Sequence, residues 1–269
     1  MIIIKSIKIL NKKIDFSNNV GFVPTMGALH KGHISLIRKS KVLCKKTLVS
    51  IFVNKSQFNK INDFKNYPRN LNKDIKILKR LKVDYLMLPN SKEIYKSKKE
   101  MKMKINRNDK IMCAKYRPGH FEGVLAVINQ FLSFMKPKYI FLGEKDYQQI
   151  FLIKKYLSKK FETKIINCRT VRTNSSLPYS SRNLLLSDKE LLIAKEISLL
   201  IKKIYKDYKK DILNKNKFNK YKSQIIKKKI KLEYLDIRNK FDLSKKVNRR
   251  SFKIFISYYI NKVRLIDNL

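Results

Sequence analysis

The sequence predicts an α/β protein built on a parallel sheet, followed by a smaller α+β domain. Short apolar runs of strand length alternate with amphipathic runs of helix length as far as about residue 170. All six glycines lie at or before Gly143. Beyond residue 171, one long helical pattern precedes a set of strand-like runs. We therefore expect one domain over residues 1–171 and a second over residues 172–269.

The expected elements of the first domain follow one another in regular order. Residues 1–19 form a basic, apolar lead-in that is either a strand or a short helix. Strands are expected at residues 20–23, 47–53, 83–88, 139–142 and 163–168, with a weaker edge-strand pattern at 101–105. Helices are expected from about Gly32 to residue 44, from Pro68 to residue 81, and at 121–135 and 147–157. In such a sheet, ligands gather beyond the carboxyl ends of the strands.

The second domain begins with a long helix at residues 187–210. Ser187 and Glu190 have the spacing of a capping box at its start. A lysine-rich segment then runs to residue 231, followed by strands at 232–237 and 253–260 and a weaker pattern at 263–266. This order predicts helices packed on a small sheet.

Length and composition indicate a folded, cytoplasmic protein. A chain of 269 residues with 43% hydrophobic residues can bury a sizeable core. The three cysteines are scattered and form no CxxC pair, so neither a disulfide framework nor a zinc site is indicated. No apolar run approaches the roughly 20 residues of a membrane-spanning helix. We expect no membrane partner.

The formal net charge of +44 would attract nucleic acid without sequence specificity. The lysines are nevertheless spread over every segment, together with many Asn and Ile residues whose codons are also A/T-rich. A biased genome would produce this composition, and no RNA-binding or helix-turn-helix signature accompanies it. We expect no specific nucleic-acid partner, and we keep nucleic-acid binding as the alternative function.

The stretch at residues 20–37 reads as a strand, a tight loop and a helix start. Gly27 and Gly32 would let phosphates approach the backbone, and the helix start would offer N–H groups to an anion. His30 and His33 would share one face of the first turn and suit charge that develops on a phosphate. The alternative is two surface histidines beside an ordinary turn, but two of the three histidines in the chain lie here.

Polar clusters follow two further strands and begin the second domain. Asn54 and Gln57 could orient a hydroxyl or carboxylate, or they could simply form a turn. The run at residues 143–149 contains Lys145, which could neutralise a phosphate, and Asp146, which could cap the next helix or hold Mg²⁺. Residues 180–183 form either a compact anion grip or a helix N-terminal turn. Donors without an activated nucleophile suit nucleotidyl transfer, in which one substrate attacks the other.

Seven motifs occur in the order typical of the pantothenate synthetase family, and the chain resembles that family over nearly its whole length. They are PTMGALHKGH at 24–33, SIFVN-x-x-QF at 50–58, YPR at 67–69, RPGHFEGV at 117–124, GEKDYQQ at 143–149, SSRN at 180–183 and RLIDN at 264–268. Lys55 stands where the family usually has Pro, and NSSLPY at 174–179 replaces a segment usually close to Pro-Asp-Gly-Leu-Ala-Met.

The resemblance implies an enzyme that joins pantoate to β-alanine with ATP and Mg²⁺, through a pantoyl-adenylate, releasing AMP and pyrophosphate. It implies a Rossmann-like domain with a C-terminal lid, and a homodimer. The implied ATP-binding residues are Met26, His30, His33, Gly143, Glu144, Lys145, Asp146, Val171, Tyr179, Ser180, Ser181 and Arg182. The implied catalytic residues among them are His30, His33, Lys145, Ser180, Ser181 and Arg182. Asn54, Gln57, His120 and Gln149 would bind pantoate, with Arg117 nearby, and no metal-ligand set is implied.

On this interpretation Lys145, Arg182, the two histidines and Mg²⁺ would neutralise the charge that opposes attack on the α-phosphate. An adenylyl transferase of the same superfamily with another acceptor is a third interpretation. Gln57 and Gln149, as pantoate-binding residues, argue against it.

Overall fold

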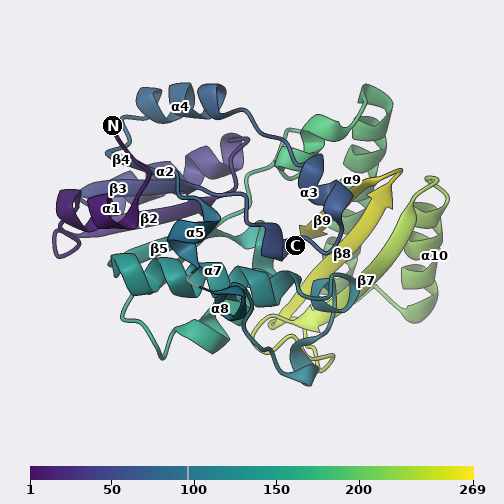
Figure 1. Cartoon of the computed structure of the whole chain (residues 1–269). Helices are drawn as coiled ribbons and strands as arrows, with labels where there is room; N and C mark the ends of the chain where they lie inside the picture. The colour runs from purple at the N-terminus through teal and green to yellow at the C-terminus, as the bar shows by residue number, and fades with distance from the viewer. Residues whose placement is uncertain (96) are drawn as a thin grey trace. The chain divides into compact units, whose positions relative to one another are not determined.

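The computed structural model describes residues 1–95 and 97–269 (Figure 1). Two compact units make up this part of the chain, Met1–Thr170 and Val171–Leu269. None of the helices among the described residues is both long enough and apolar enough to cross a membrane.

The first unit is built on a six-stranded parallel sheet with the order β1-β4-β3-β2-β5-β6. Its strands are β1 Ile2–Ile4, β2 Val20–Thr25, β3 Lys46–Ile51, β4 Tyr85–Met87, β5 Tyr139–Gly143 and β6 Lys164–Cys168. β2 pairs with β3 on one side and with β5 on the other. The order in which successive strands are added therefore reverses between β2 and β5. α/β proteins of this type bind ligands at such a point, beyond the carboxyl ends of the strands.

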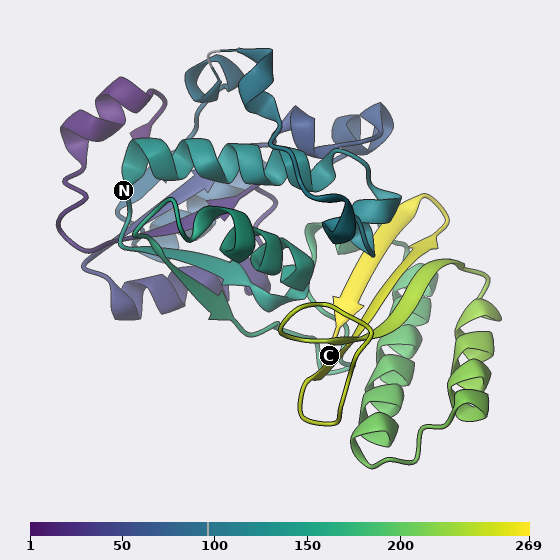
Figure 2. The ribbon, with the colours of Figure 1, turned by 90° about the horizontal axis from the view of Figure 1, so that it is seen from below.

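Helices cover both faces of this sheet (Figure 2). The α-helices are α1 Ile7–Lys13, α2 Lys31–Leu43, α3 Ile61–Lys65, α4 Leu71–Arg80, α5 Ser91–Ile94, α6 Cys113–Tyr116, α7 His120–Met135 and α8 Tyr147–Leu157. The 3₁₀ helices are η1 Lys55–Gln57, η2 Lys98–Met101, η3 Arg107–Asp109 and η4 Glu144–Asp146. Buried residues of α2 and α4 form one core cluster with the sheet, and α7 lies on the opposite face. This arrangement confirms the expected α/β class.

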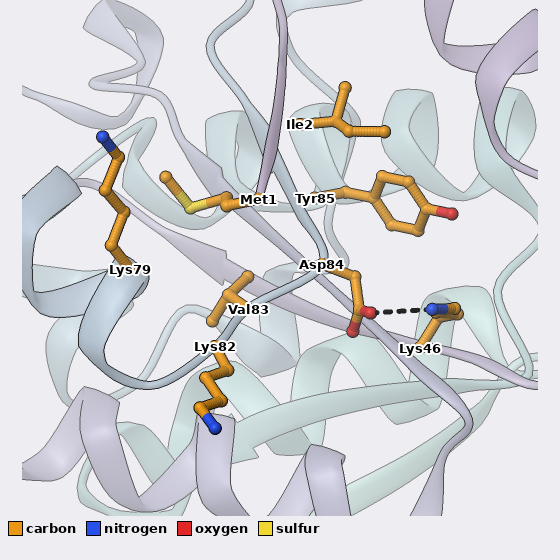
Figure 3. A pocket seen from close by; sticks show the side chains of 8 residues that line it. All are labelled: Met1, Ile2, Lys46, Lys79, Lys82, Val83, Asp84 and Tyr85. Atoms are coloured by element: carbon orange, nitrogen blue, oxygen red, sulfur yellow. Dashed lines mark hydrogen bonds and ion pairs between the residues drawn. The ribbon is translucent and has the colours of Figure 1, made fainter.

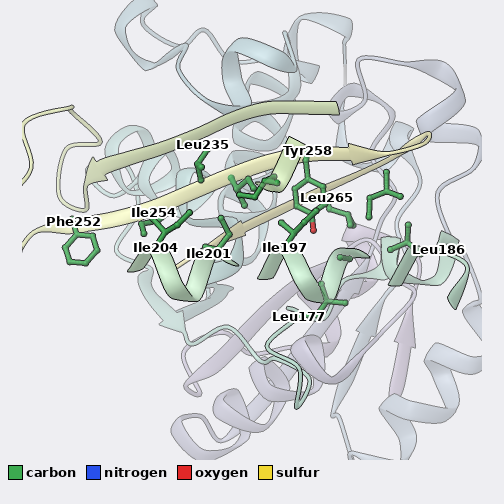
Figure 4. Packing of buried hydrophobic residues seen from close by; sticks show 14 residues of the cluster. Leu177, Leu186, Ile197, Ile201, Ile204, Leu235, Phe252, Ile254, Tyr258 and Leu265 are labelled. Carbon is green, nitrogen blue, oxygen red and sulfur yellow. The ribbon is translucent and has the colours of Figure 1, made fainter. Parts of the chain in front are cut away.

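The second unit is a three-stranded antiparallel sheet, β7-β8-β9, packed against helices. Its elements are η5 Ser181–Leu185, α9 Asp188–Lys209, α10 Lys215–Ile226, β7 Lys231–Asn239, β8 Phe252–Ile260 and β9 Val263–Asn268. Ile197, Ile201 and Ile204 of α9 lie against the buried face of β8 (Figure 4). Ser187 and Glu190 form the expected capping box. The unit is an α+β structure, as predicted.

Several local predictions need correction. Residues 101–105 form no strand, because the N–H of Met103 bonds to the carbonyl of Glu122 and not to a strand partner. Pro68 precedes α4 and does not open it, since Asn70 caps that helix through Lys73. The lead-in contains both a strand and a helix. Helix α10 was hidden in the lysine-rich segment, where Phe218, Tyr221 and Ile225 supply an apolar face.

Candidate active site

The loop after β2 is held in place by a buried carboxylate. Gly27 and Ala28 both have positive φ, at 79° and 49°. Asp74 of α4 is 2% exposed and accepts hydrogen bonds from Ala28 N at 2.9 Å and Leu29 N at 2.8 Å. Two backbone donors thus offset the cost of burying the carboxylate, and the carboxylate in turn stabilises the left-handed conformation of Ala28.

Sequence reasoning missed Asp74, although a signal was present. Asp74 is the acidic residue of α4, lies on the same helix face as Leu78, and stands in a chain with 64 basic and 20 acidic residues. An acid on a buried helix face needs a hydrogen-bonding partner, and here the partner is the loop 45 and 46 residues away in the sequence. Burial raises the pKa of the Asp74 carboxyl, while the bonds from Leu29 and Ala28 act in the opposite direction.

The two histidines of the loop stack at the start of α2. His30 caps the helix, and its Nδ1 accepts from Gly32 N at 3.1 Å. Nδ1 of His33 accepts from His30 N at 3.4 Å, and the ring centroids lie 4.0 Å apart. Because both Nδ1 atoms accept, the hydrogen-bond pattern assigns the proton of each neutral ring to Nε2.

Both histidines are neutral at pH 7 in the protein without ligand. Burial lowers the pKa of His30 to about 2, with further lowering by His33 and Lys145. Burial also lowers the pKa of His33 to about 4, where Asp146 opposes the shift and Lys145 adds to it. In this state the two rings therefore carry no positive charge of their own.

The loop after β5 meets the loop after β2. Lys145 acts electrostatically on both histidines, and its Nζ lies 3.5 Å from Asp146 Oδ1. Asp146 does not cap α8 with its side chain, contrary to one of the two expectations for it. A Cβ added at Gly143 would have no neighbour within 4 Å, so the backbone there borders open space. Glu144 and Met26 are half-buried beside these loops.

The loop after β3 is fastened to α7. Asn54 is fully buried, donates from Nδ2 to Gly123 O at 3.3 Å, and accepts from Ser56 Oγ at 3.0 Å. A Cβ at Gly123 would lie 2.4 Å from Ser56 O, so only glycine lets α7 approach this closely. Asn54 therefore shapes the loop instead of facing a ligand.

His120 and Arg117 grip the backbone of the same loop. Nδ1 of His120 donates to Gln57 O at 2.7 Å, and its Nε2 accepts from Arg117 Nη1 at 2.8 Å. Nη2 of Arg117 lies 3.4 Å from Gln57 O. Both ring nitrogens of His120 are thus committed to protein groups, which differs from the expected contact with pantoate.

Two glutamines remain as candidate ligand-binding residues: Gln57 at the end of η1, which follows β3, and Gln149 in the first turn of α8, which follows β5. Within the described part of the chain, the side-chain amides of Gln57 and Gln149 make no hydrogen bond, and Gln57 is 8% exposed. The adjacent Gln148 is different: its amide bonds to Cys113 N at 3.0 Å and Ile111 O at 2.8 Å. A nearly buried amide with no protein partner is suited to orienting a polar ligand.

The remaining predicted residues form a second group, in the second unit. Tyr179 N donates to Val171 O at 3.1 Å, which closes a loop between them. Ser180 caps η5 by accepting from Arg182 N at 3.3 Å, Ser181 is 5% exposed, and Arg182 is half-buried.

A hollow of about 490 Å³ lies elsewhere, at the amino ends of β1, β3 and β4 (Figure 3). Lys46 and Asp84 pair at 3.0 Å in its wall. Its lining contains none of the predicted site residues, and those of the first unit that follow β2, β3 and β5 lie at the opposite, carboxyl ends of the strands. Across residues 1–95 and 97–269, no cluster of three or more His, Cys, Asp or Glu is arranged to hold a metal ion.

Comparison with known proteins identifies the family. Residues 2–269 match the family model described as pantoate-beta-alanine ligase. The chain belongs to this family. It is 43% identical over 270 residues to a pantothenate synthetase of Francisella tularensis subsp. mediasiatica, covering 98% of this chain and 94% of that protein.

Solved structures of the ligase family agree with this membership. A pantoate-beta-alanine ligase from Francisella tularensis, crystallised with "Beta-gamma ATP and Beta-alanine", is 40% identical with a TM-score of 0.85 and covers 100% of this chain and 97% of its own. A pantothenate synthetase from Thermus thermophilus is 27% identical with a TM-score of 0.93, over 100% and 99% of the two chains.

Replacing Asp74 with Asn should destabilise the loop after β2, whose Ala28 and Leu29 N–H groups it binds. The Asn amide has one acceptor oxygen for two backbone donors, so one N–H loses its partner. The free energy of unfolding should therefore fall by about 1–3 kcal/mol. Denaturant unfolding measures this. Asp242→Asn, in an exposed turn that Asn can also form, should change little, and equal effects of the two variants would contradict the role of Asp74.

The neutral state of His30 and His33 can be tested by NMR. In ¹⁵N NMR, His30 and His33 should keep the Nε2–H form from pH 8 down to about pH 5, since their pKa values are about 2 and about 4. An unfolded chain protonates histidine near pH 6.5, so their contribution to stability is complete above that pH and is lost progressively below it. A titration midpoint near 6.5 for either residue would refute the assignment.

Proposed function

We propose that this protein joins pantoate to β-alanine at the expense of ATP, in two steps through pantoyl-adenylate. The observation that carries the proposal is the convergence of His30, His33 and Lys145 beyond the carboxyl ends of β2 and β5, where the strand order of the sheet reverses. The chain that carries them belongs to the pantoate–β-alanine ligase family. The site provides donors and positive charge at this position, which suits binding and polarising a triphosphate.

The first step needs no protein nucleophile. A carboxylate oxygen of pantoate attacks the α-phosphorus of ATP, and the bond to the β-phosphate oxygen breaks to release pyrophosphate. The amine of β-alanine then attacks the acyl carbon, AMP leaves with its oxygen, and the amine loses a proton. The protein aligns the reactants and reduces charge repulsion, which accounts for the donor-rich composition of the site.

Lys145 supplies the fixed positive charge, and the histidines supply directed donors. Nδ1 of each ring accepts a backbone N–H, so in the neutral ring the donor is Nε2–H, and we assign that group to the phosphate oxygens. Asp146 is suited to the ribose hydroxyls, and Met26, Gly143 and Glu144 border the nucleotide. The start of α2 adds backbone donors to the same anion.

Gln57 and Gln149 are proposed to hold pantoate through its hydroxyl and carboxylate. Their amides make no hydrogen bond to the described residues, and they follow the strands on the two sides of β2. Asn54 and His120 support this role indirectly, because both fix the backbone of the Gln57 loop.

Mg²⁺ fits this donor set as a companion of the nucleotide. The described residues offer no cage for a metal, whereas Asp146 presents one half-exposed carboxylate next to Lys145. Mg²⁺ commonly binds through one or two carboxylates together with substrate phosphates. When bound, it would neutralise phosphate charge.

The second unit is proposed to act as a lid. Val171 and Tyr179 would meet the adenine side, and Ser180, Ser181 and Arg182 would close on the phosphates. Closure would shield the adenylate from water until β-alanine arrives. The proposal includes a homodimer and a cytoplasmic location, as the resemblance to the family implies.

The experiment is pyrophosphate release with ATP and Mg²⁺, with pantoate and β-alanine each present or omitted. We expect release that depends on pantoate and turns over only with β-alanine. Lys145→Gln should reduce kcat by on the order of 100-fold, while Val42→Ala, at a 78% exposed site on α2, should not. Folded protein that releases no pyrophosphate with pantoate would refute the ligase, and salt-dependent nucleic-acid binding would then be the next explanation.

A Gly123→Ala variant tests the support of Gln57. Its Cβ would displace Ser56 O and hence the Gln57 loop, so kcat/KM for pantoate should fall by on the order of 10- to 100-fold. Steady-state kinetics with each substrate varied measures this, and KM for ATP should change much less. Ser133→Ala, exposed on the same helix, is the control. Equal changes in both KM values would contradict the assignment of the Gln57 loop to pantoate.

A further inference from the structure

Arg172 forms a paired contact with the end of the chain. Its Nη1 donates to Asp267 Oδ2 at 2.8 Å and its Nη2 to Asp267 Oδ1 at 2.7 Å, a bidentate pair inside the second unit. The same guanidinium donates to Ser176 O at 2.9 Å and Asn268 O at 2.8 Å. One side chain thus connects strand β9 to the loop at residues 172–178.

This 172–178 loop is ordered along its length by its own bonds. Thr173 N donates to Leu177 O at 2.8 Å, and Ser176 N donates to Thr173 O at 2.9 Å. Leu177 is 4% exposed and packs in the core of the second unit. Arg172 and Pro178 form an isolated antiparallel bridge, so the two ends of the loop lie side by side.

The loop sets the spacing of the residues proposed to bind ATP. Val171 precedes it, Tyr179 follows it, and the two are joined by the bond from Tyr179 N to Val171 O. Asn183 Nδ2 donates to Pro178 O at 3.1 Å, which fastens the turn containing Ser180–Arg182 to the same loop. A shift of the loop relative to β9 would therefore move the adenine-side and phosphate-side residues together.

The Arg172–Asp267 pair is suited to fixing the position of the 172–178 loop on β9. Asp267 is 4% exposed and Arg172 is 19% exposed at the side chain, so the pair lies largely out of water. Buried ion pairs add little net stability on average, but a bidentate arginine fork allows few arrangements. The fork also bonds to the backbone oxygen of Ser176, so the side chains of the loop can vary without losing the contact.

We propose that Arg172 and Asp267 are a positioning pair for ATP, which fixes the 172–178 loop on β9 and so presents Val171 and Tyr179–Arg182 in one geometry. The inference rests on the proposed function of those residues. It assigns a role to Asp267 within the RLIDN run at residues 264–268. It also explains how the NSSLPY segment at 174–179, which departs from the usual family sequence, can hold the same backbone position: Arg172 binds the Ser176 carbonyl and not a side chain.

A matched pair in the same unit provides the control. Arg238 is 9% exposed, donates from Nε to Asp236 Oδ2 at 2.9 Å, and donates from Nη1 to Leu243 O at 2.9 Å. It therefore combines an ion pair with a loop carbonyl, as Arg172 does, but the loop it holds joins β7 to β8. A purely structural effect on the second unit should appear in both lysine variants.

The test compares Arg172→Lys with Arg238→Lys in the full chain. For each variant, kcat and the KM values for ATP and pantoate are measured by pyrophosphate release, alongside Tm and the Kd of a non-hydrolysable ATP analogue. Lysine keeps the charge but loses the fork, so Arg172→Lys should weaken ATP binding by on the order of tenfold or more, with KM for pantoate within about twofold. Arg238→Lys should leave both KM values unchanged.

An unchanged KM for ATP in Arg172→Lys, or equal changes in both lysine variants, would overturn the positioning role. If Arg172→Lys does not fold, Asp267→Asn, which keeps one acceptor oxygen, replaces it under the same criteria. The wild type is measured first: absence of pantoate-dependent release there refutes the proposed function, whereas an active wild type with an unaffected Arg172→Lys variant refutes the positioning pair alone.

Discussion

The parallel direction of β2, β3 and β5 is the constraint on which the site depends. Because these three strands pair side by side and run the same way, the loops that follow them end at one edge of the sheet. The histidines, the Gln57 loop and Lys145 come from segments far apart in the sequence, and strand direction alone places them at that edge. The hollow of Figure 3, at the opposite ends of the strands, has no part in this arrangement.

Buried polar groups hold the loops of the site in shape. Asp74 accepts from two N–H groups of the loop after β2, while Asn54 of the loop after β3 bonds to Gly123 of α7 and His120 of α7 bonds to Gln57 of that loop. Each of these groups has protein partners that offset the cost of burial. The side-chain amides of Gln57 and Gln149 make no hydrogen bond to the described residues, which is why we propose these two, and not Asn54 or His120, as the residues that bind a ligand.

Charge in the site is divided between two kinds of group. Lys145 raises the positive potential at His30 and His33 and, together with burial, keeps both rings neutral. Neutral imidazoles bring directed N–H donors to a phosphate without adding to the repulsion among cations. The net charge of +44 is spread over both units and does not define the site, whose character comes from a few placed groups.

The sequence by itself determined the alternation of strands and helices, the family and the residues of the motifs, because hydrophobic periodicity and loop composition are local properties. It was wrong about residues 101–105 and overlooked α10, since a lysine-rich or irregular run does not reveal its packing partner. Only the tertiary structure decided that His120 supports Gln57, that Asp74 holds the loop after β2, and that Arg172 grips Asp267, 95 residues away. These roles depend on which buried donor meets which acceptor, and folding alone brings such atoms together.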